Sequence, residues 1–388
     1  MYSALLAIIY IAFISLGLPD SLLGSAWPVM HADLGAPLSF AGAISMIIAG
    51  STIVSSLMSD RMTRKLGAGL VTALSVAMTA VALFGFSISH SVILLCLFAV
   101  PYGLGAGAVD AALNNYVALH YSSRHMSWLH CFWGVGVSIS PYIMGFCLQR
   151  NLGWHMGYRS VSVFQVVLTV ILFFSLPLWK KRDTEAEEAA GTKVLSLFDA
   201  VKIKGVPHVL LAFFGYCALE TTAGLWASSY LVDVRNVDTT TAARFASLFF
   251  IGITVGRFLN GFVADRFGDR KMIRIGIVIT IIGNVMVLLP VPVKIVALIG
   301  LIVIGLGCAP IYPCVIHATP ANFGRENSQA IVGIQMASAY LGSTLMPPLF
   351  GLIAQYVSLA LYPYYMMLFS LLMLIMTELL FKITHKEK

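Results

Sequence analysis

The sequence predicts an all-α polytopic membrane protein whose twelve transmembrane helices form two parallel-related six-helix bundles. Its 388 residues are 59% hydrophobic and only 11% charged, whereas a soluble chain would carry about 25% charged residues. Twelve apolar segments can be delimited, most of them near the ~20 residues that cross the hydrocarbon core of a bilayer. We place these segments at 4–30, 39–59, 66–89, 92–121, 125–149, 158–179, 206–232, 241–264, 272–291, 294–317, 326–356 and 359–381.

The distribution of basic residues sets the expected orientation. The net charge is +7, but with the amino terminus inside, few of the 24 Lys and Arg residues fall on the outer side, namely Arg150, Arg159, Arg235, Arg244 and Lys294. Arg257 lies within a span, and the other 18 lie on the inner side. This bias places both termini in the cytoplasm of a bacterial-type inner membrane, and the first segment is too long for a cleavable signal. The excess of basic over acidic residues therefore indicates the membrane topology and not a nucleic-acid partner.

Several function classes are disfavoured by the motifs that the sequence lacks. The six cysteines all fall in spans and show no metal-ligand spacing. We find no nucleotide-binding loop or nucleophile elbow and no sizeable extramembrane domain. We therefore expect no enzymatic activity, no cofactor and no metal, and a membrane enzyme or a receptor is the least favoured hypothesis.

The first span carries an acid between two prolines. Pro19 and Pro28 break the helical hydrogen-bond ladder, Asp20 lies near mid-span, and Trp27 follows. Broken helices persist at membrane depth where neighbouring helices or water satisfy the freed backbone groups. The combination is typical of a segment that lines a cavity.

The fourth span carries a second acid. Asp110 follows the glycine-rich run 103–107, and a charge at membrane depth costs roughly 2.5–3.5 kcal/mol on insertion scales. Asn114 is four residues further on and shares a helix face with Asp110, and Asn115 comes next. Such a set predicts a polar cavity inside the bundle.

The fifth span combines small residues with two groups that can contact a solute. Gly134 and Gly136 allow close approach of another helix, while His130 and Trp133 supply a polar and an aromatic side chain. For His130, a purely structural hydrogen bond is the alternative interpretation.

The longest loop divides the chain. We predict an N-terminal bundle over 1–182, a cytoplasmic linker over 183–205 and a C-terminal bundle over 206–388. Within the linker, residues 194–202 are amphipathic and are expected to lie along the membrane interface.

The second half repeats the first at a distance near 200 residues. Asp60 and Arg61 recur as Asp265 and Arg266, and the Gly-Leu-Gly of 103–105 recurs at 305–307. Asp20 is echoed by Glu220, again in a span. Two six-helix repeats of like orientation are related by an axis along the membrane normal, and in transporters built this way the solute binds where the halves meet.

The loop between the eighth and ninth spans resembles a known family motif. Residues 261–271 read GFVADRFGDRK, similar to the cytoplasmic loop motif of the major facilitator superfamily. The first-half counterpart keeps Asp60, Arg61, Arg64 and Lys65, but has Ser56 and Thr63 where glycines are expected. The resemblance covers the whole chain and implies the major facilitator fold.

The same resemblance implies a role for the loop motif. Each aspartate can accept hydrogen bonds from a neighbouring helix N-terminus and pair with nearby arginines, and so act as a cytoplasmic gate. Topology anchoring by positive charge is the alternative. The gating set consists of Asp60, Arg61, Arg64, Asp265, Arg266 and Arg270.

Within the superfamily, the chain is most similar to the fucose permease and related hexose–proton symporters. The similarity lies in Asp20 and in the Asp110–Asn114 run. It implies that Asp110 binds the coupling proton and that Asp20 and Asn114 hold sugar hydroxyls or couple their binding. Asn115 stands where that family often has proline, and the fourth-span acid is Asp where the family has Glu, so the substrate is left open.

The acids and aromatic residues of the spans suit coupled transport of a sugar. A desolvated carboxyl group favours its protonated form and can exchange a proton between the two sides, which makes Asp20, Asp110 and Glu220 coupling candidates. Sugar hydroxyls need polar partners, and the sugar ring needs an aromatic face. For each aromatic residue, plain helix packing or anchoring at the membrane interface is the alternative. The candidate contacts are Asp20, Asn114, Asn115, Trp27, His130, Trp133, Trp226, Asn284, Tyr312 and Gln335. Glu378 is expected to pair with Lys382, four residues further on.

We therefore hypothesise a monomeric, proton-coupled importer of a hexose or other small polyol. Sodium coupling stays open, because carboxylates and the carbonyl groups of broken helices suit either ion. The alternative is a proton-coupled exporter of drugs or metabolites on the same fold.

Overall fold

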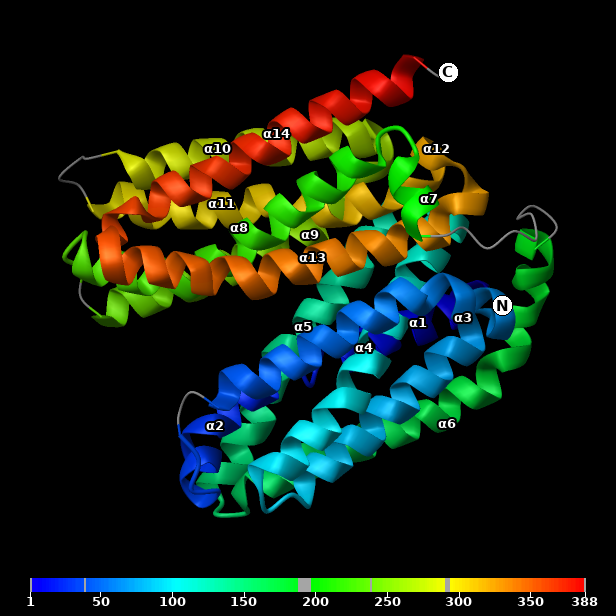
Figure 1. Cartoon of the computed structure of the whole chain (residues 1–388), viewed down its shortest axis with the longest axis horizontal. Helices are drawn as coiled ribbons and strands as arrows, with labels where there is room; N and C mark the ends of the chain where they lie inside the picture. The colour runs from blue at the N-terminus through cyan, green and yellow to red at the C-terminus, as the bar shows by residue number, and fades with distance from the viewer. Residues whose placement is uncertain (1, 38–39, 188–196, 238, 290–293, 387–388) are drawn as a thin grey trace. The chain divides into compact units, whose positions relative to one another are not determined.

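The computed structural model describes residues 2–37, 40–187, 197–237, 239–289 and 294–386, most of which are helical. Figure 1 shows the helices in chain order. Their bounds are α1 Tyr2–Gly17, α2 Leu22–Asp33, α3 Phe40–Ser87, α4 Val92–His120, α5 Ser123–Gln149, α6 Gly153–Glu187, α7 Leu197–Lys202, α8 Val206–Asp233, α9 Thr239–Phe267, α10 Asp269–Leu288, α11 Lys294–His317, α12 Thr319–Phe323, α13 Arg325–Ile353 and α14 Tyr362–Lys386.

Ten stretches in the described residues are long and apolar enough to cross a membrane. The first, Ala4–Trp27, joins the shorter helices α1 and α2 into one span, whereas Phe40–Ser87 and Arg325–Thr384 each contain two helices of membrane length, which gives twelve spans. In α3, Gly67 has a non-helical backbone (φ 78°, ψ 153°) that divides the element in two, and glycine adopts a positive φ without steric cost. A π-helical turn over Ala354–Ser358 and a 3₁₀ turn over Leu359–Leu361 separate α13 from α14. The predicted all-α membrane fold is confirmed.

The chain divides into two compact units. The first comprises Met1–Tyr116 and Leu129–Val194, and the second comprises Val117–Trp128 and Leu195–Lys388. The second unit thus includes the end of α4, the connection to α5 and the first residues of α5. Of the predicted linker, residues 188–196 lie outside the described residues, and α7 forms the rest of the predicted amphipathic segment.

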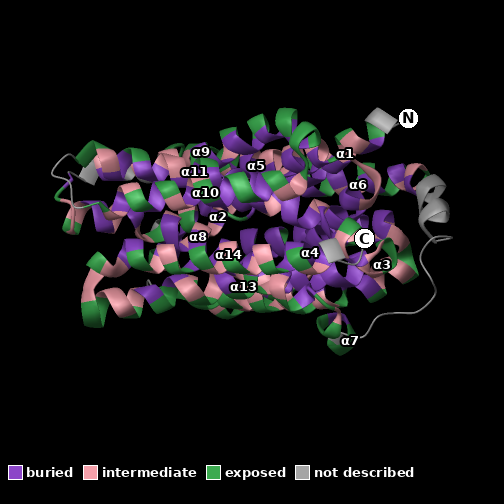
Figure 2. Ribbon diagram, turned by 90° about the horizontal axis from the view of Figure 1, so that it is seen from above, coloured by how far each residue is buried: buried purple, intermediate pink, exposed green. Residues whose placement is uncertain are grey.

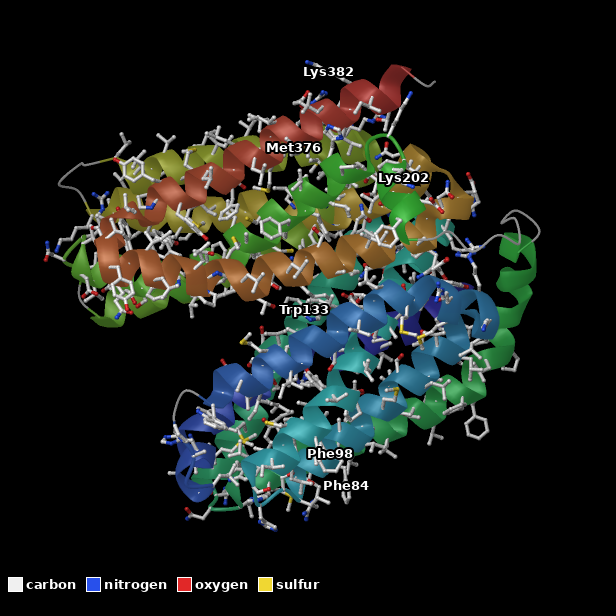
Figure 3. All side chains as sticks on the ribbon, in the orientation of Figure 1. Phe84, Phe98, Trp133, Lys202, Met376 and Lys382 are labelled. Carbon is white, nitrogen blue, oxygen red and sulfur yellow. The ribbon has the colours of Figure 1, made fainter. Side chains whose placement is uncertain are left out.

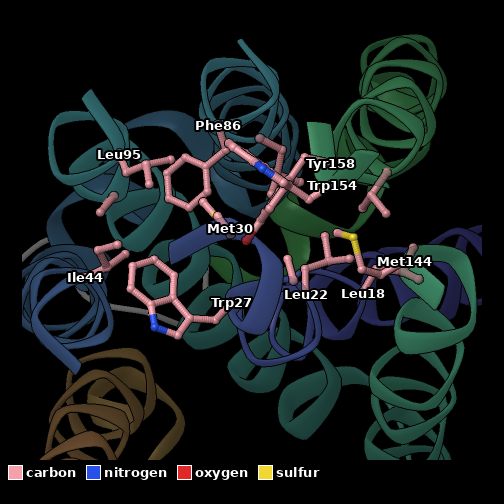
Figure 4. Packing of buried hydrophobic residues seen from close by; sticks show 14 of the residues in the cluster. Leu18, Leu22, Trp27, Met30, Ile44, Phe86, Leu95, Met144, Trp154 and Tyr158 are labelled. Carbon is pink, nitrogen blue, oxygen red and sulfur yellow. The ribbon is translucent and has the colours of Figure 1, made fainter. Parts of the chain in front are cut away.

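An apolar cluster drawn from α2 to α6 forms a core in the first unit. Leu22, Trp27 and Trp154 are fully or almost fully buried in it (Figure 4). Other apolar side chains are exposed on the outer faces of the helices, for example Ile93 at 75% and Phe174 at 83%, and Figure 2 shows how buried and exposed residues alternate along the helices. Lipid chains solvate such faces as well as protein does, so these faces suit a bilayer.

Close helix packing at glycine recurs in both units. A Cβ added to Gly103 in α4 would lie 2.2 Å from the backbone oxygen of Ile48 in α3. A Cβ added to Gly305 in α11 would lie 2.3 Å from the backbone oxygen of Phe249 in α9. Gly103 and Gly305 occupy matching positions of the sequence repeat. The repeated glycine run therefore brings helices together in the same way in each unit.

Candidate functional site

The break in the first span presents Asp20. Helix α1 ends at Gly17 and α2 begins at Leu22, and a turn that includes Pro19 joins them. Asp20 remains exposed while both of its carboxylate oxygens accept hydrogen bonds. The Tyr102 hydroxyl donates to Oδ1, and the Trp133 indole donates to Oδ2, each at 2.9 Å. Two neutral donors from α4 and α5 thus orient an accessible carboxylate.

A reciprocal glycine contact sets the position of Trp133, which Figure 3 labels on α5. A Cβ on Gly17 would lie 2.2 Å from the backbone oxygen of Trp133, and one on Gly136 would lie 2.2 Å from the backbone oxygen of Ile14. Because neither helix has a side chain at these points, the backbones of α1 and α5 approach closely. The indole then reaches the carboxylate at the break that follows α1.

Asp110, Asn114 and His130 form a buried hydrogen-bonded chain in the first unit. The Asn114 amide donates to Asp110 Oδ1 at 2.8 Å, as expected for residues one helical turn apart. His130 Nε2 lies 3.0 Å from Asn114 Oδ1. Because an amide oxygen only accepts, Nε2 is the donor. All three side chains are at most 5% exposed, and Asn115 beside them is also buried. The arrangement holds an acid deep in the unit with an amide and an imidazole attached.

In the second unit, Glu220 pairs with Arg257. The Arg257 side chain is 4% exposed. Its Nη2 lies 3.5 Å from Glu220 Oε1 and 3.3 Å from the Tyr216 hydroxyl. The guanidinium also stands over the Tyr312 ring at 5.9 Å, a cation–π geometry. A buried charge needs such partners. Arg257, the arginine that the sequence places within a span, is therefore the ion-pair partner of Glu220.

Two aromatic residues that are predicted to contact the solute, Trp27 and Trp226, pack against other helices. Trp27 belongs to the apolar cluster of the first unit. The Trp226 indole donates to the backbone oxygen of Pro347 at 3.0 Å, and a Cβ on Gly351 would lie 2.8 Å from its ring. Their roles as solute contacts stay predictions.

Two predicted amide contacts are buried in the second unit. Gln335 accepts from the Thr319 hydroxyl at 3.0 Å, and Asn284 donates to Ser370 at 2.6 Å. Both amides are fully buried. Their solute contacts also remain predictions.

The loop-motif residues divide into bonded and exposed groups. In α3, Asp60 accepts from Arg64 at 2.8 Å. Asp265 accepts from the Ser122 hydroxyl and the Arg124 backbone nitrogen, both at 3.0 Å. Arg124 is the second residue of α5, so Asp265 bonds a helix N-terminus as expected.

The arginines of the loop motif differ in their partners and in their exposure. The ion-pair partner of Asp265 is Arg124, at 3.4 Å, and not an arginine of its own loop. Arg270 donates to Thr384 at 2.8 Å, and Arg61 and Arg266 are exposed. The gating role of the motif stays a prediction.

Sequence reasoning missed two tyrosines that bond charged side chains. Tyr102 and Tyr216 supply the hydroxyls at Asp20 and Arg257. The available signal was a tyrosine in mid-span, which needs a polar partner when it is buried. Among the described residues, no group of three or more His, Cys, Asp or Glu side chains is arranged to hold a metal ion.

Comparisons with known proteins identify a family and several relatives. The sequence matches the profile of the Major Facilitator Superfamily over residues 9–246 and 209–388. It is 21% identical over 284 residues to "Bypass of stop codon protein 6" of Saccharomyces cerevisiae, which spans 67% of this chain and 57% of the yeast protein. It is 23% identical over 292 residues to the "Glucose/mannose transporter GlcP" of Bacillus subtilis, spanning 73% of this chain and 70% of that one.

A solved structure has the same fold. The transporter FucP in its outward conformation superposes with a TM-score of 0.77, covering 96% of this chain and 97% of that chain at 14% identity.

Proposed function

The chain belongs to the Major Facilitator Superfamily, whose members are membrane transporters and not enzymes, and we propose that it imports a small sugar together with protons by alternating access. A hexose or deoxyhexose is the proposed solute. The relative GlcP carries glucose and mannose by its name. Further parts of the proposal are a bacterial-type inner membrane, cytoplasmic termini and a monomer.

The observation that carries the proposal is the accessible Asp20 carboxylate with Trp133 and Tyr102 bonded to it at 2.9 Å. A carboxylate accepts hydrogen bonds from sugar hydroxyls. An indole offers an apolar face to the ring and a polar edge to the acid. This arrangement of Asp20, Trp133 and Tyr102 suits a hydrophilic solute. The lipophilic substrate of a drug exporter would form fewer hydrogen bonds with it.

Asp110 is the proposed proton carrier. It is 5% exposed and bonded to Asn114, which His130 bonds in turn. Proton gain by a buried carboxyl removes a charge that is costly at membrane depth, so protonation and movement of the surrounding helices are energetically linked. The amide and imidazole hold the acid and connect it to α5.

The second unit is proposed to contribute Glu220 and Arg257. The two charges balance each other, so the pair suits an uncharged solute whose hydroxyls both donate and accept. Tyr312 beside the guanidinium offers an aromatic face. Glu220 also remains a candidate for proton coupling. When a solute hydroxyl replaces Arg257 as its partner, the Glu220 carboxylate loses the positive charge that balanced it.

Purified protein in liposomes tests the proposal. Addition of a sugar from a hexose panel should acidify the lumen, as reported by a trapped pH dye, and the same sugar should raise the melting temperature. If the response to sugar requires sodium, then sodium and not the proton is the coupling ion. Proton uptake with lipophilic cations, and none with any sugar, would support the exporter instead.

A further inference from the structure

The imidazole of His317 bridges two acceptors in the second unit. Its Nδ1 lies 2.7 Å from Oδ2 of Asp269, and its Nε2 lies 3.0 Å from the backbone oxygen of Tyr121. Carboxylate and carbonyl oxygens accept hydrogen bonds and do not donate them. Both ring nitrogens must therefore carry hydrogen, and only the protonated imidazole has two such donors.

Asp269 has the surroundings of an ionised carboxylate. It is the first residue of α10, where the helix dipole stabilises a negative charge. Its other oxygen, Oδ1, accepts a hydrogen bond from the Ser123 hydroxyl at 2.6 Å. Ser123 opens α5, so Asp269 and His317 both hold residues of the segment 117–128, which we call the α4–α5 segment.

The charges that face His317 are balanced when it is protonated. Asp265 on α9 pairs with Arg124 of α5 at 3.4 Å, and Asp269 pairs with His317. Loss of the His317 proton removes the cation that pairs with Asp269. Further titratable or charged groups on the elements packed here are Cys314 on α11, His125 on α5 and Arg325, which donates to the backbone oxygen of Leu119.

We propose that His317 is a proton-binding site whose bound proton holds the α4–α5 segment against α10 and α11. Deprotonation removes the ion pair to Asp269 and one of the two hydrogen bonds. The segment continues directly into α4 and α5, which carry Asp110 and His130. Its release frees the helices that hold the proposed coupling acid, so the local pH sets how readily they move.

Cys314 provides the readout. Its thiol is fully buried and lies 3.7 Å from the Ser123 hydroxyl and 3.8 Å from Asn260, so departure of the α4–α5 segment exposes it. The experiment uses the full chain with the other five cysteines replaced by serine. N-ethylmaleimide labelling of Cys314 is timed at about pH 6 and about pH 8, on either side of ordinary imidazole titration. Comparing variants at one pH removes the intrinsic pH dependence of the thiol.

His317→Gln should label about tenfold faster than its parent at about pH 6, because a charge-assisted hydrogen bond is lost. The difference should shrink as the pH rises toward about 8. His317→Lys, which keeps a positive charge, should label slowly at both values. His208→Gln on α8 is the matched control and should label like the parent.

Equal labelling of His317→Gln and parent at about pH 6 would overturn the proposal, as would a ratio that does not change with pH. Asp269→Asn gives the same comparison if His317→Gln does not fold. The readout needs no transported solute, so its failure is distinct from failure of the proposed sugar transport.

Discussion

Trp133 and His130 stand three residues apart on α5 and serve the two acids of the first unit. The Trp133 indole donates to Asp20 at 2.9 Å, and His130 Nε2 donates to Asn114, which donates to Asp110. Residues at this spacing are neighbours on one helix face. One face of α5 therefore contacts both Asp20, the carboxylate proposed to bind the solute, and the hydrogen-bonded network of Asp110, the proposed proton carrier.

Trp133→Phe should weaken sugar binding while leaving the fold intact. Phenylalanine keeps an aromatic face but cannot donate to Asp20, and a hydrogen bond to a charged group contributes about 1.5–3 kcal/mol. We expect the KM for the sugar to rise about tenfold or more, measured as uptake into liposomes. Trp179→Phe loses an indole bonded to the Ser175 hydroxyl, away from the candidate solute contacts, and serves as the comparison. An unchanged KM in Trp133→Phe would remove Trp133 from the solute site.

Gly17→Ala should destabilise the protein through overpacking. The added methyl group would lie 2.2 Å from the Trp133 backbone oxygen, and forcing atoms into a packed contact costs about 1–3 kcal/mol. Thermal unfolding in detergent measures the effect. Gly24→Ala is the matched control, because nothing lies within 4 Å of a Cβ there. Equal melting temperatures for the two variants would refute the close contact of α1 and α5.

Arg257→Met should be strongly destabilising, and Glu220→Gln should restore much of the loss. Removing one partner of a buried ion pair costs about 3–5 kcal/mol, whereas replacing both is often nearly neutral. The double variant Glu220→Gln/Arg257→Met should therefore melt above Arg257→Met alone. The more exposed pair of Arg274 and Glu378 is the control, with an expected effect of about 0–1 kcal/mol. A double variant no more stable than Arg257→Met would mean that the charges are not coupled.

The fold and the pairing of Asn114 with Asp110 could be predicted from the sequence, because both depend on patterns between residues close in sequence. Apolar segments of membrane length define the spans, and helix geometry places Asn114 beside Asp110. The hydrogen-bond partner of Glu378 was not predicted, for a physical reason. Lys382 lies one turn away, but Glu378 accepts two hydrogen bonds from Arg274 of α10, at 2.5 and 2.8 Å.

The contacts between helices could not be predicted in the same way. Asp20 meets Trp133 across 113 positions of sequence, and Glu220 meets Arg257 on the next long helix. Such pairs depend on how each helix is rotated about its axis. Tight packing at residues such as Gly17 and Gly136 fixes that rotation, and one sequence does not show which helices meet at a given glycine.

Transport by Asp110→Asn most directly tests the central claim that Asp110 carries the coupling proton. Asparagine keeps the size of the side chain but cannot exchange a proton in the physiological range. We expect loss of accumulation driven by a proton gradient, while counterflow of labelled sugar against unlabelled sugar continues at a rate close to that of the parent. Loss of both activities in folded, inserted protein would contradict the account and assign Asp110 to solute binding, and accumulation that persists would exclude Asp110 as the proton carrier.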